Sequence, residues 1–284
     1  MASSSSFSTG KSAQERGWSY VPDCYVVPAP QRQSTLHSEV AKVPVVDLAA
    51  LRQGSARRPV VIEDIRNACQ RLGSSRYIVN HDICQSVLDG SLSSGFDFFK
   101  LPTGEKMEFM SNDVRKPVRY ATSLKKGIDK VQFWRVLLKH YAHPLKDWID
   151  AWPANPPSYR PVYMYMISTY AYRMRNDDGE WGAVEQLQGA LQVHLGDHVE
   201  VLSNGFYKSV VHRASLINRD RTRISIASLQ SLGMDELMKP AKERVHEQQP
   251  NRYKESSFRD VLNSLSNNDI REGKSFINTL KMKS

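Results

Sequence analysis

Residues 189–213 read GALQVHLGDHVEVLSNGFYKSVVHR. Apolar and polar residues alternate on both sides of Gly196-Asp197, and an alternation of period two is typical of a half-buried strand. Ser203-Asn204-Gly205 has the composition of a turn that joins two hairpin strands. The alternation continues over residues 207–212 and returns over residues 222–228. Successive strands joined by short turns predict an antiparallel barrel or jelly roll in this half of the chain.

The first hundred residues mix strand and helix patterns. Residues 42–48 form an apolar run with proline near its start, which predicts an edge strand. Apolar residues then recur at helical spacing from Val61 to the stop signal Gly73, so we expect a helix there. Residues 77–79 predict a strand, and Asp82 is a suitable N-cap for a second helix. The fold class is therefore α+β.

The composition is that of an ordinary globular chain with a modest positive charge. The chain has 284 residues, of which 40% are hydrophobic and 24% charged, and its net charge is +9. The basic residues occur as short pairs without interleaved aromatic residues, so we expect no nucleic-acid partner. No apolar run approaches the roughly 18 residues that a membrane span needs, and we expect no membrane partner.

The cysteines and the N-terminal residues indicate in which cellular compartment the protein lies. Cys24, Cys69 and Cys84 form no CxxC pair, which argues against a disulfide framework and for a reducing compartment. Residues 1–16 are rich in serine, and no acidic residue precedes Glu15. This composition fits a disordered tail or a short plastid transit peptide. We expect a cytoplasmic protein, or a chloroplast protein if the tail is a transit peptide.

Three polar residues near the end of the strand-rich half are candidates for chemistry. His212 ends one predicted strand, and Arg223 and Ser225 open the next. Period-two geometry places Arg223 and Ser225 on the same face of that strand. A guanidinium beside a hydroxyl inside a barrel suits the binding of a carboxylate. The alternative is an arginine and a serine on an outward-facing, solvated strand face.

Together these segments resemble plant iron(II)- and 2-oxoglutarate-dependent dioxygenases of the isopenicillin-N-synthase-like group. The resemblance rests on residues 189–213 and 223–227, and on earlier segments that occur in the family's order: 43–48, 68–73, 79–81, 98–102 and 152–157. It implies a double-stranded β-helix, or jelly-roll, core that is incomplete here, with N-terminal helices and a C-terminal helix. It also implies a monomer that acts on a small-molecule substrate.

The resemblance assigns roles to the three candidate residues. It implies Fe(II) held by two histidines and a carboxylate, with 2-oxoglutarate as cosubstrate and ascorbate as reductant. His212 matches the distal metal histidine, and Arg223 and Ser225 match the pair that holds the cosubstrate's far carboxylate. The implied reaction is oxidation of a small aromatic plant metabolite, either a flavonoid or an indoleamine such as melatonin.

The chain departs from the family at one place. Family members carry the other two metal ligands in an HxD motif upstream of the distal histidine, but residues 161–175 contain neither histidine nor aspartate. His198 and Glu200 have HxE spacing, yet in the family that strand carries no ligand. His194 and Asp197 are three residues apart and would not share a strand face. We therefore expect structural roles for these four residues.

The departure leaves a second reading of function open. The chain is either a dioxygenase or a catalytically impaired, truncated or spliced family member that acts as a non-catalytic binding protein. The expected organisation is a tail over 1–16, a helix and strand region over 17–160, a jelly-roll remnant with the 2-oxoglutarate clamp over 161–234, and a helical segment over 235–284. Ser257 is the expected N-cap of a helix in the last segment.

Overall fold

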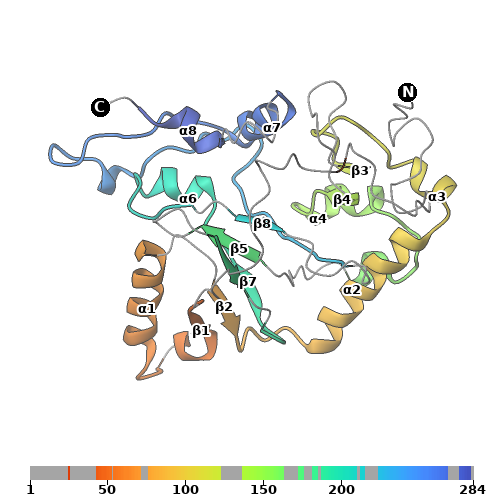
Figure 1. Cartoon of the computed structure of the whole chain (residues 1–284), viewed down its shortest axis with the longest axis horizontal. Helices are drawn as coiled ribbons and strands as arrows, with labels where there is room; N and C mark the ends of the chain where they lie inside the picture. The colour runs from red at the N-terminus through yellow and green to blue at the C-terminus, as the bar shows by residue number, and fades with distance from the viewer. Residues whose placement is uncertain are drawn as a thin grey trace. The chain divides into compact units, whose positions relative to one another are not determined.

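The structure is a computed structural model that describes residues 25, 43–52, 54–71, 76–122, 136–162, 172–175, 181–184, 187–209, 212–214, 223–267 and 275–282 (Figure 1). These residues divide into two units built from interleaved segments. The first unit includes Ser94–Met164 and Arg259–Phe276, and the second includes Thr35–Ser93, Tyr165–Phe258 and Ile277–Ser284. The four regions expected from the sequence remain predictions. None of the described helices has the length and apolar character needed to cross a membrane.

A three-stranded sheet forms one part of the second unit. Its strands are β1 (Val45–Asp47), β2 (Arg76–Val79) and β7 (Leu191–Val193), in the order β1-β2-β7. β1 runs parallel to β2, and β7 runs antiparallel to it. The expected strands are confirmed, including the edge position of β1. Since strand residues alternate between faces, Ile78 and Leu191 lie on one face of this sheet, and Tyr77 and Gln192 lie on the other.

Helix α1 (Arg58–Arg71) packs beside this sheet and confirms the helix expected from Val61. Val46 and Val61 are buried in one apolar cluster, with Ile65 and Ile78 packed against it. A short 3-10 helix, η4 (Leu48–Leu51), follows β1 and adds to the same cluster. The helical spacing of the apolar residues therefore places the inner side of α1 on one sheet face. The expected stop at Gly73 lies outside the described residues.

A second three-stranded sheet of this unit carries His212. Its order is β6 (Trp181–Val184), β5 (Tyr172–Arg175) and β8 (His212–Ala214), and both pairings are antiparallel. His212 lies opposite Met174 in the register. The second unit also contains α6 (Asp197–Leu202) and η6 (Lys242–Arg244). Helix α8 (Phe276–Leu280) lies in the second unit except for its first residue.

The first unit is built around aromatic residues. Phe98, Tyr120 and Tyr159 are buried together, and the ring centroids of Phe98 and Tyr159 lie 5.8 Å apart. The sheet of this unit pairs two antiparallel strands. Two helices, α2 (Gln85–Lys100) and α7 (Phe258–Asn267), have residues in both units. The other elements of the first unit are α3 (Thr103–Met107), β3 (Val118–Thr122), β4 (Val136–His140), α4 (Leu145–Trp148), η5 (Ile149–Ala151) and α5 (Tyr159–Val162). α7 confirms the helix expected after Ser257.

The strand expected over residues 198–202 is wrong, because these residues form helix α6. Asn204 (φ 51°) and Gly205 (φ 79°) adopt left-handed conformations that close this helix. The Asn204 amide donates to Val201 O, and the Gly205 amide donates to Glu200 O. This pair of bonds is a Schellman cap. The turn expected at Ser203-Asn204-Gly205 is therefore a helix end and not a hairpin.

Three smaller expectations also differ from the structure. Residues 207–209 and 223–228 have no regular secondary structure, although both ranges were expected in strands. α2 begins at Gln85 and not at Asp82, which has a φ of 60° and binds Arg52. A short alternating segment forms a strand only where a neighbouring strand provides backbone hydrogen bonds to it. Residues 223–228 have no such strand partner among the described residues.

Candidate functional site

His212 lies on β8, at the edge of the second sheet of its unit. Its side chain is exposed, and its strand neighbour in the register is Met174 on β5. The sequence resemblance makes this residue the expected metal ligand. Its place on a paired strand fixes the backbone, while its exposure leaves the imidazole accessible from solvent.

A second imidazole lies beside His212. The ring of His194, which directly follows β7, has its centroid 4.9 Å from that of His212, with 18° between the ring planes. Burial, and then the neighbouring His212, lower the pKa of His194 from 6.5 to about 4. His194 is therefore neutral at pH 7, which is the form of imidazole that binds metals. The structural role expected of His194 overlooked this contact.

The strand that leads to His194 adds an unsatisfied polar group. Gln192 lies on β7 opposite Tyr77 of β2, two residues before His194. The nitrogen and the oxygen of its carboxamide are both buried and have no hydrogen-bond partner among the described residues. Buried polar groups are nearly always hydrogen bonded, and leaving one unpaired costs about 1–3 kcal/mol. A water molecule or a polar ligand beside β7 would therefore stabilise this side chain.

Arg223 and Ser225 lie in the segment that follows β8 in the described chain. The Arg223 side chain is exposed, Ser225 is half-buried, and the adjacent Ile226 is 5% exposed. Burial of Ile226 anchors this segment in the second unit, the unit that also contains His212. The assignment of Arg223 and Ser225 as the 2-oxoglutarate clamp remains a prediction.

Glu200 has a structural environment. Its carboxylate is 3% exposed, and it accepts hydrogen bonds from the Tyr253 hydroxyl at 2.7 Å and from the Ser209 amide at 2.8 Å. Burial alone would raise the pKa of Glu200, but these hydrogen bonds and the nearby Lys208 lower it below its ordinary value. A carboxylate held in this way is ionised at pH 7 and is committed to protein donors.

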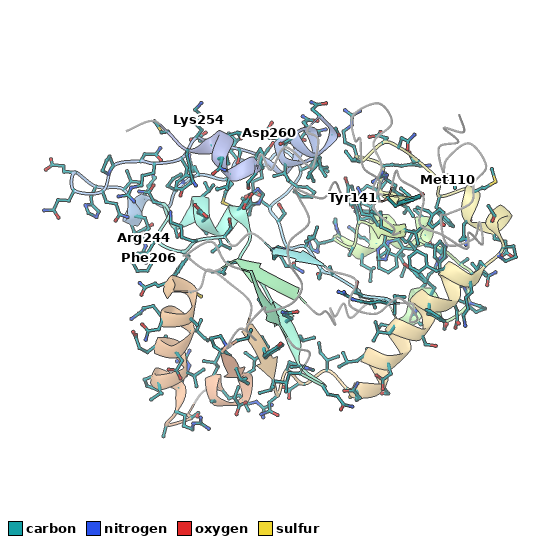
Figure 2. All side chains as sticks on the ribbon, in the orientation of Figure 1. Met110, Tyr141, Phe206, Arg244, Lys254 and Asp260 are labelled. Atoms are coloured by element: carbon teal, nitrogen blue, oxygen red, sulfur yellow. The ribbon has the colours of Figure 1, made fainter. Side chains whose placement is uncertain are left out.

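The segment after α6 is fixed by similar contacts. The Asn204 carboxamide donates to Arg244 O at 3.0 Å and accepts from the Arg252 amide at 3.0 Å. The Arg244 guanidinium lies 4.4 Å from the centre of the Phe206 ring (Figure 2). His198 Nδ1 and Ser231 Oγ form a hydrogen bond of 3.2 Å. The expected structural roles of His198 and Glu200 agree with these contacts.

The donors found in the structure fit part of the iron site that the family uses. Within the described ranges, no group of three or more histidine, cysteine, aspartate or glutamate side chains could hold a metal. His194 and His212 do form a pair of imidazoles, which are suitable ligands for iron. The carboxylate of the family's site has no counterpart in this pair.

Comparisons with known proteins decide the family. Residues 43–160 match the family described as the N-terminal part of the non-haem dioxygenase in morphine synthesis, and residues 136–231 match the 2OG-Fe(II) oxygenase superfamily. The chain belongs to the 2OG-Fe(II) oxygenase superfamily. Its members among the relatives below are 2-oxoglutarate-dependent dioxygenases, and the resemblance inferred from the sequence is confirmed.

Two rice relatives and one solved structure illustrate the match. Flavanone 3-dioxygenase 3 of Oryza sativa subsp. japonica is 35% identical over 84% of this chain and 93% of that protein. The chloroplastic 2-oxoglutarate-dependent dioxygenase 21 of the same plant is 35% identical over 84% of this chain and 91% of that protein. The crystal structure of JOX2 in complex with 2OG, Fe and JA has a TM-score of 0.74, at 22% identity over 97% of each chain.

The alignment with the flavanone dioxygenase also shows a difference in length. It runs over 309 positions, although only 84% of this chain of 284 residues takes part in it. The relative therefore has residues at many positions where this chain has none.

Proposed function

We propose that the protein is an Fe(II)- and 2-oxoglutarate-dependent dioxygenase that oxidises a small aromatic plant metabolite. The observation that carries the proposal is the 35% identity to a flavanone 3-dioxygenase over most of both chains. This match favours a flavonoid substrate, with an indoleamine such as melatonin as the second candidate. The core that supports the site is a jelly roll, in keeping with the likeness to JOX2.

Three side chains have assigned roles in this proposal. His212 donates an imidazole nitrogen to the iron, and its backbone is held by the pairing of β8 with β5. Arg223 holds the far carboxylate of 2-oxoglutarate with its planar guanidinium, and Ser225 donates its hydroxyl to the same carboxylate. Bound iron and 2-oxoglutarate together supply the activation of dioxygen. The protein's part is to position the cosubstrate and the organic substrate.

The proposal also covers the reductant, the oligomeric state and the compartment. Ascorbate serves as the reductant that keeps iron in the Fe(II) state, and the enzyme is a monomer without nucleic-acid or membrane partners. The chloroplast is the favoured compartment if residues 1–16 are a transit peptide, and the cytoplasm is favoured otherwise. The chloroplastic rice relative supports the first alternative.

The clamp is tested through the KM for 2-oxoglutarate. In the full chain with Fe(II), ascorbate and a flavanone, Arg223→Lys replaces a two-pronged donor with a single point charge. We expect the KM for 2-oxoglutarate to rise by about 10-fold or more, which is the effect of losing one charged hydrogen bond. Ser225→Ala should raise the KM less. An unchanged KM in Arg223→Lys would remove this residue from the clamp.

The second candidate function is a non-catalytic binding protein of the same family. The observation in its favour is that the described residues include no group of three metal-ligating side chains. This candidate predicts that 2-oxoglutarate or a flavonoid binds, measured by calorimetry, without any succinate being formed. Succinate formed in proportion to substrate oxidised would exclude it.

A further inference from the structure

We propose that His194 and His212 bind one divalent transition metal ion together. His194 then provides the second imidazole, in place of the histidine that residues 161–175 lack. The inference rests on the proposed function for the identity of the metal as iron. The sequence assigns no ligand role to His194, and the contact between the two rings is the observation that does so.

The separation of the two rings suits a shared ion. With a metal to nitrogen bond of about 2.1 Å and a ring centre about 1.1 Å beyond the nitrogen, each ring centre lies about 3.2 Å from the metal. Ligand angles between 90° and 109° then place the two ring centres roughly 4.5–5.2 Å apart. The observed separation of 4.9 Å lies inside this range.

The orientation of the rings can adjust to an ion. The planes lie 18° from parallel, and both nitrogens must turn toward one point to share a metal. His212 is exposed, so rotation about its Cβ–Cγ bond requires no repacking of the core. This torsion in histidine has broad minima, which permits a change in ring orientation. His194 is half-buried at the end of β7 and provides the fixed side of the pair.

The surroundings of the pair supply further polar contacts. Gln192 lies two residues before His194, and its buried carboxamide has no hydrogen-bond partner in the part of the chain that the structure describes. Both its donor and its acceptor are satisfied if water or a cosubstrate oxygen occupies the position next to the ion. Groups that orient metal ligands and metal-bound water are a regular part of metal sites. With the two oxygens that 2-oxoglutarate donates, the pair gives the ion four donors.

The direct test counts the imidazoles on a bound metal in the unaltered protein. The full chain, stripped of metal with a chelator, is loaded with one equivalent of Cu(II), and pulsed EPR detects the remote nitrogens of coordinated imidazoles. We expect two equivalent imidazoles. Spectra with one imidazole or none would overturn the inference, and this readout requires neither a variant nor turnover.

Variants identify which histidines are involved. Co(II) affinity is measured by calorimetry for His194→Asn and His212→Asn, with circular dichroism to confirm folding. We expect each substitution to weaken Co(II) binding by roughly 10- to 100-fold, since loss of a direct ligand costs at least as much as loss of a group that orients one. His246→Asn is the control, because His246 is exposed and its backbone bonds to Gln249. Equal affinity in wild type and His194→Asn would overturn the inference.

The outcomes separate this inference from the proposed function. Succinate formation that persists in His194→Asn supports the dioxygenase and overturns the role of His194. Metal binding that depends on both histidines, without succinate from any substrate, supports the paired site while the proposed function fails. Loss of both metal binding and turnover in the wild type overturns both.

Discussion

The bond between Tyr253 and Glu200 gives a stability prediction whose size follows from the structure. Tyr253 is 2% exposed and Glu200 3% exposed, and the hydroxyl donates to Glu200 Oε1 at 2.7 Å. In Tyr253→Phe that oxygen keeps only Lys208 Nζ, at 3.6 Å, and the Lys208 side chain is 52% exposed. A hydrogen bond to a buried charge contributes about 1.5–3 kcal/mol, so the free energy of unfolding should fall by about 2 kcal/mol.

The assay is chemical and thermal unfolding of the purified chain. For a chain of this size the loss corresponds to a decrease of roughly 3–4 °C in Tm. Tyr207→Phe is the control, because the Tyr207 hydroxyl makes no hydrogen bond to the described residues and its ring packs edge-on against Phe206. In the Glu200→Gln background, Tyr253→Phe should cost less, since the acceptor is then neutral. A change below about 0.5 kcal/mol in the wild-type background would refute the reasoning.

Three further predictions concern other parts of the chain. Burial lowers the pKa of His140 from 6.5 to about 4, and the centre of the Trp152 ring lies 4.1 Å from that of its imidazole. As the pH falls, His140 is protonated first in the unfolded chain, so the free energy of unfolding should fall by about 2–3 kcal/mol between about pH 6.5 and 4. Unfolding curves of His140→Gln should lack this pH dependence, and an unchanged pH dependence would contradict the prediction. Gln192→Leu removes a buried carboxamide that has no hydrogen-bond partner among the described residues, and it should raise the stability of the ligand-free protein by about 1 kcal/mol, seen as a higher Tm. A lower Tm would show that the carboxamide is satisfied. Asp82→Asn breaks an ion pair to Arg52 whose side chains are 63% and 75% exposed and should change stability by less than about 1 kcal/mol in urea unfolding, and a larger loss would contradict a surface role.

Local pattern predicted the elements whose apolar residues repeat over several turns or face a strand partner. α1, α7, β1 and β2 were found where their periodicity placed them. The pattern failed over residues 198–202, because a short run of alternating residues also fits a short helix with one buried side. The two left-handed residues and the burial of Glu200 decide in favour of the helix, and both depend on packing against residues far along the chain.

The sequence also predicted only part of the candidate site. His212 was found because its flanking residues resemble a family motif. His194 was given a structural role, since the spacing argument considered only residues on one strand. Its contact is made with β8, which begins 18 residues later and belongs to a different sheet. The available signal was the shared strand face of Gln192 and His194, two polar residues within an apolar strand.

Turnover of 2-oxoglutarate tests the central claim most directly. Succinate and oxidised substrate are measured together after incubation of the full chain with Fe(II), ascorbate, 2-oxoglutarate and a flavanone or an indoleamine. We expect succinate and oxidised product in equal amounts, lost in His212→Asn and retained in the exposed control His246→Asn. Absence of succinate with every substrate, from protein that is folded by circular dichroism, would contradict it.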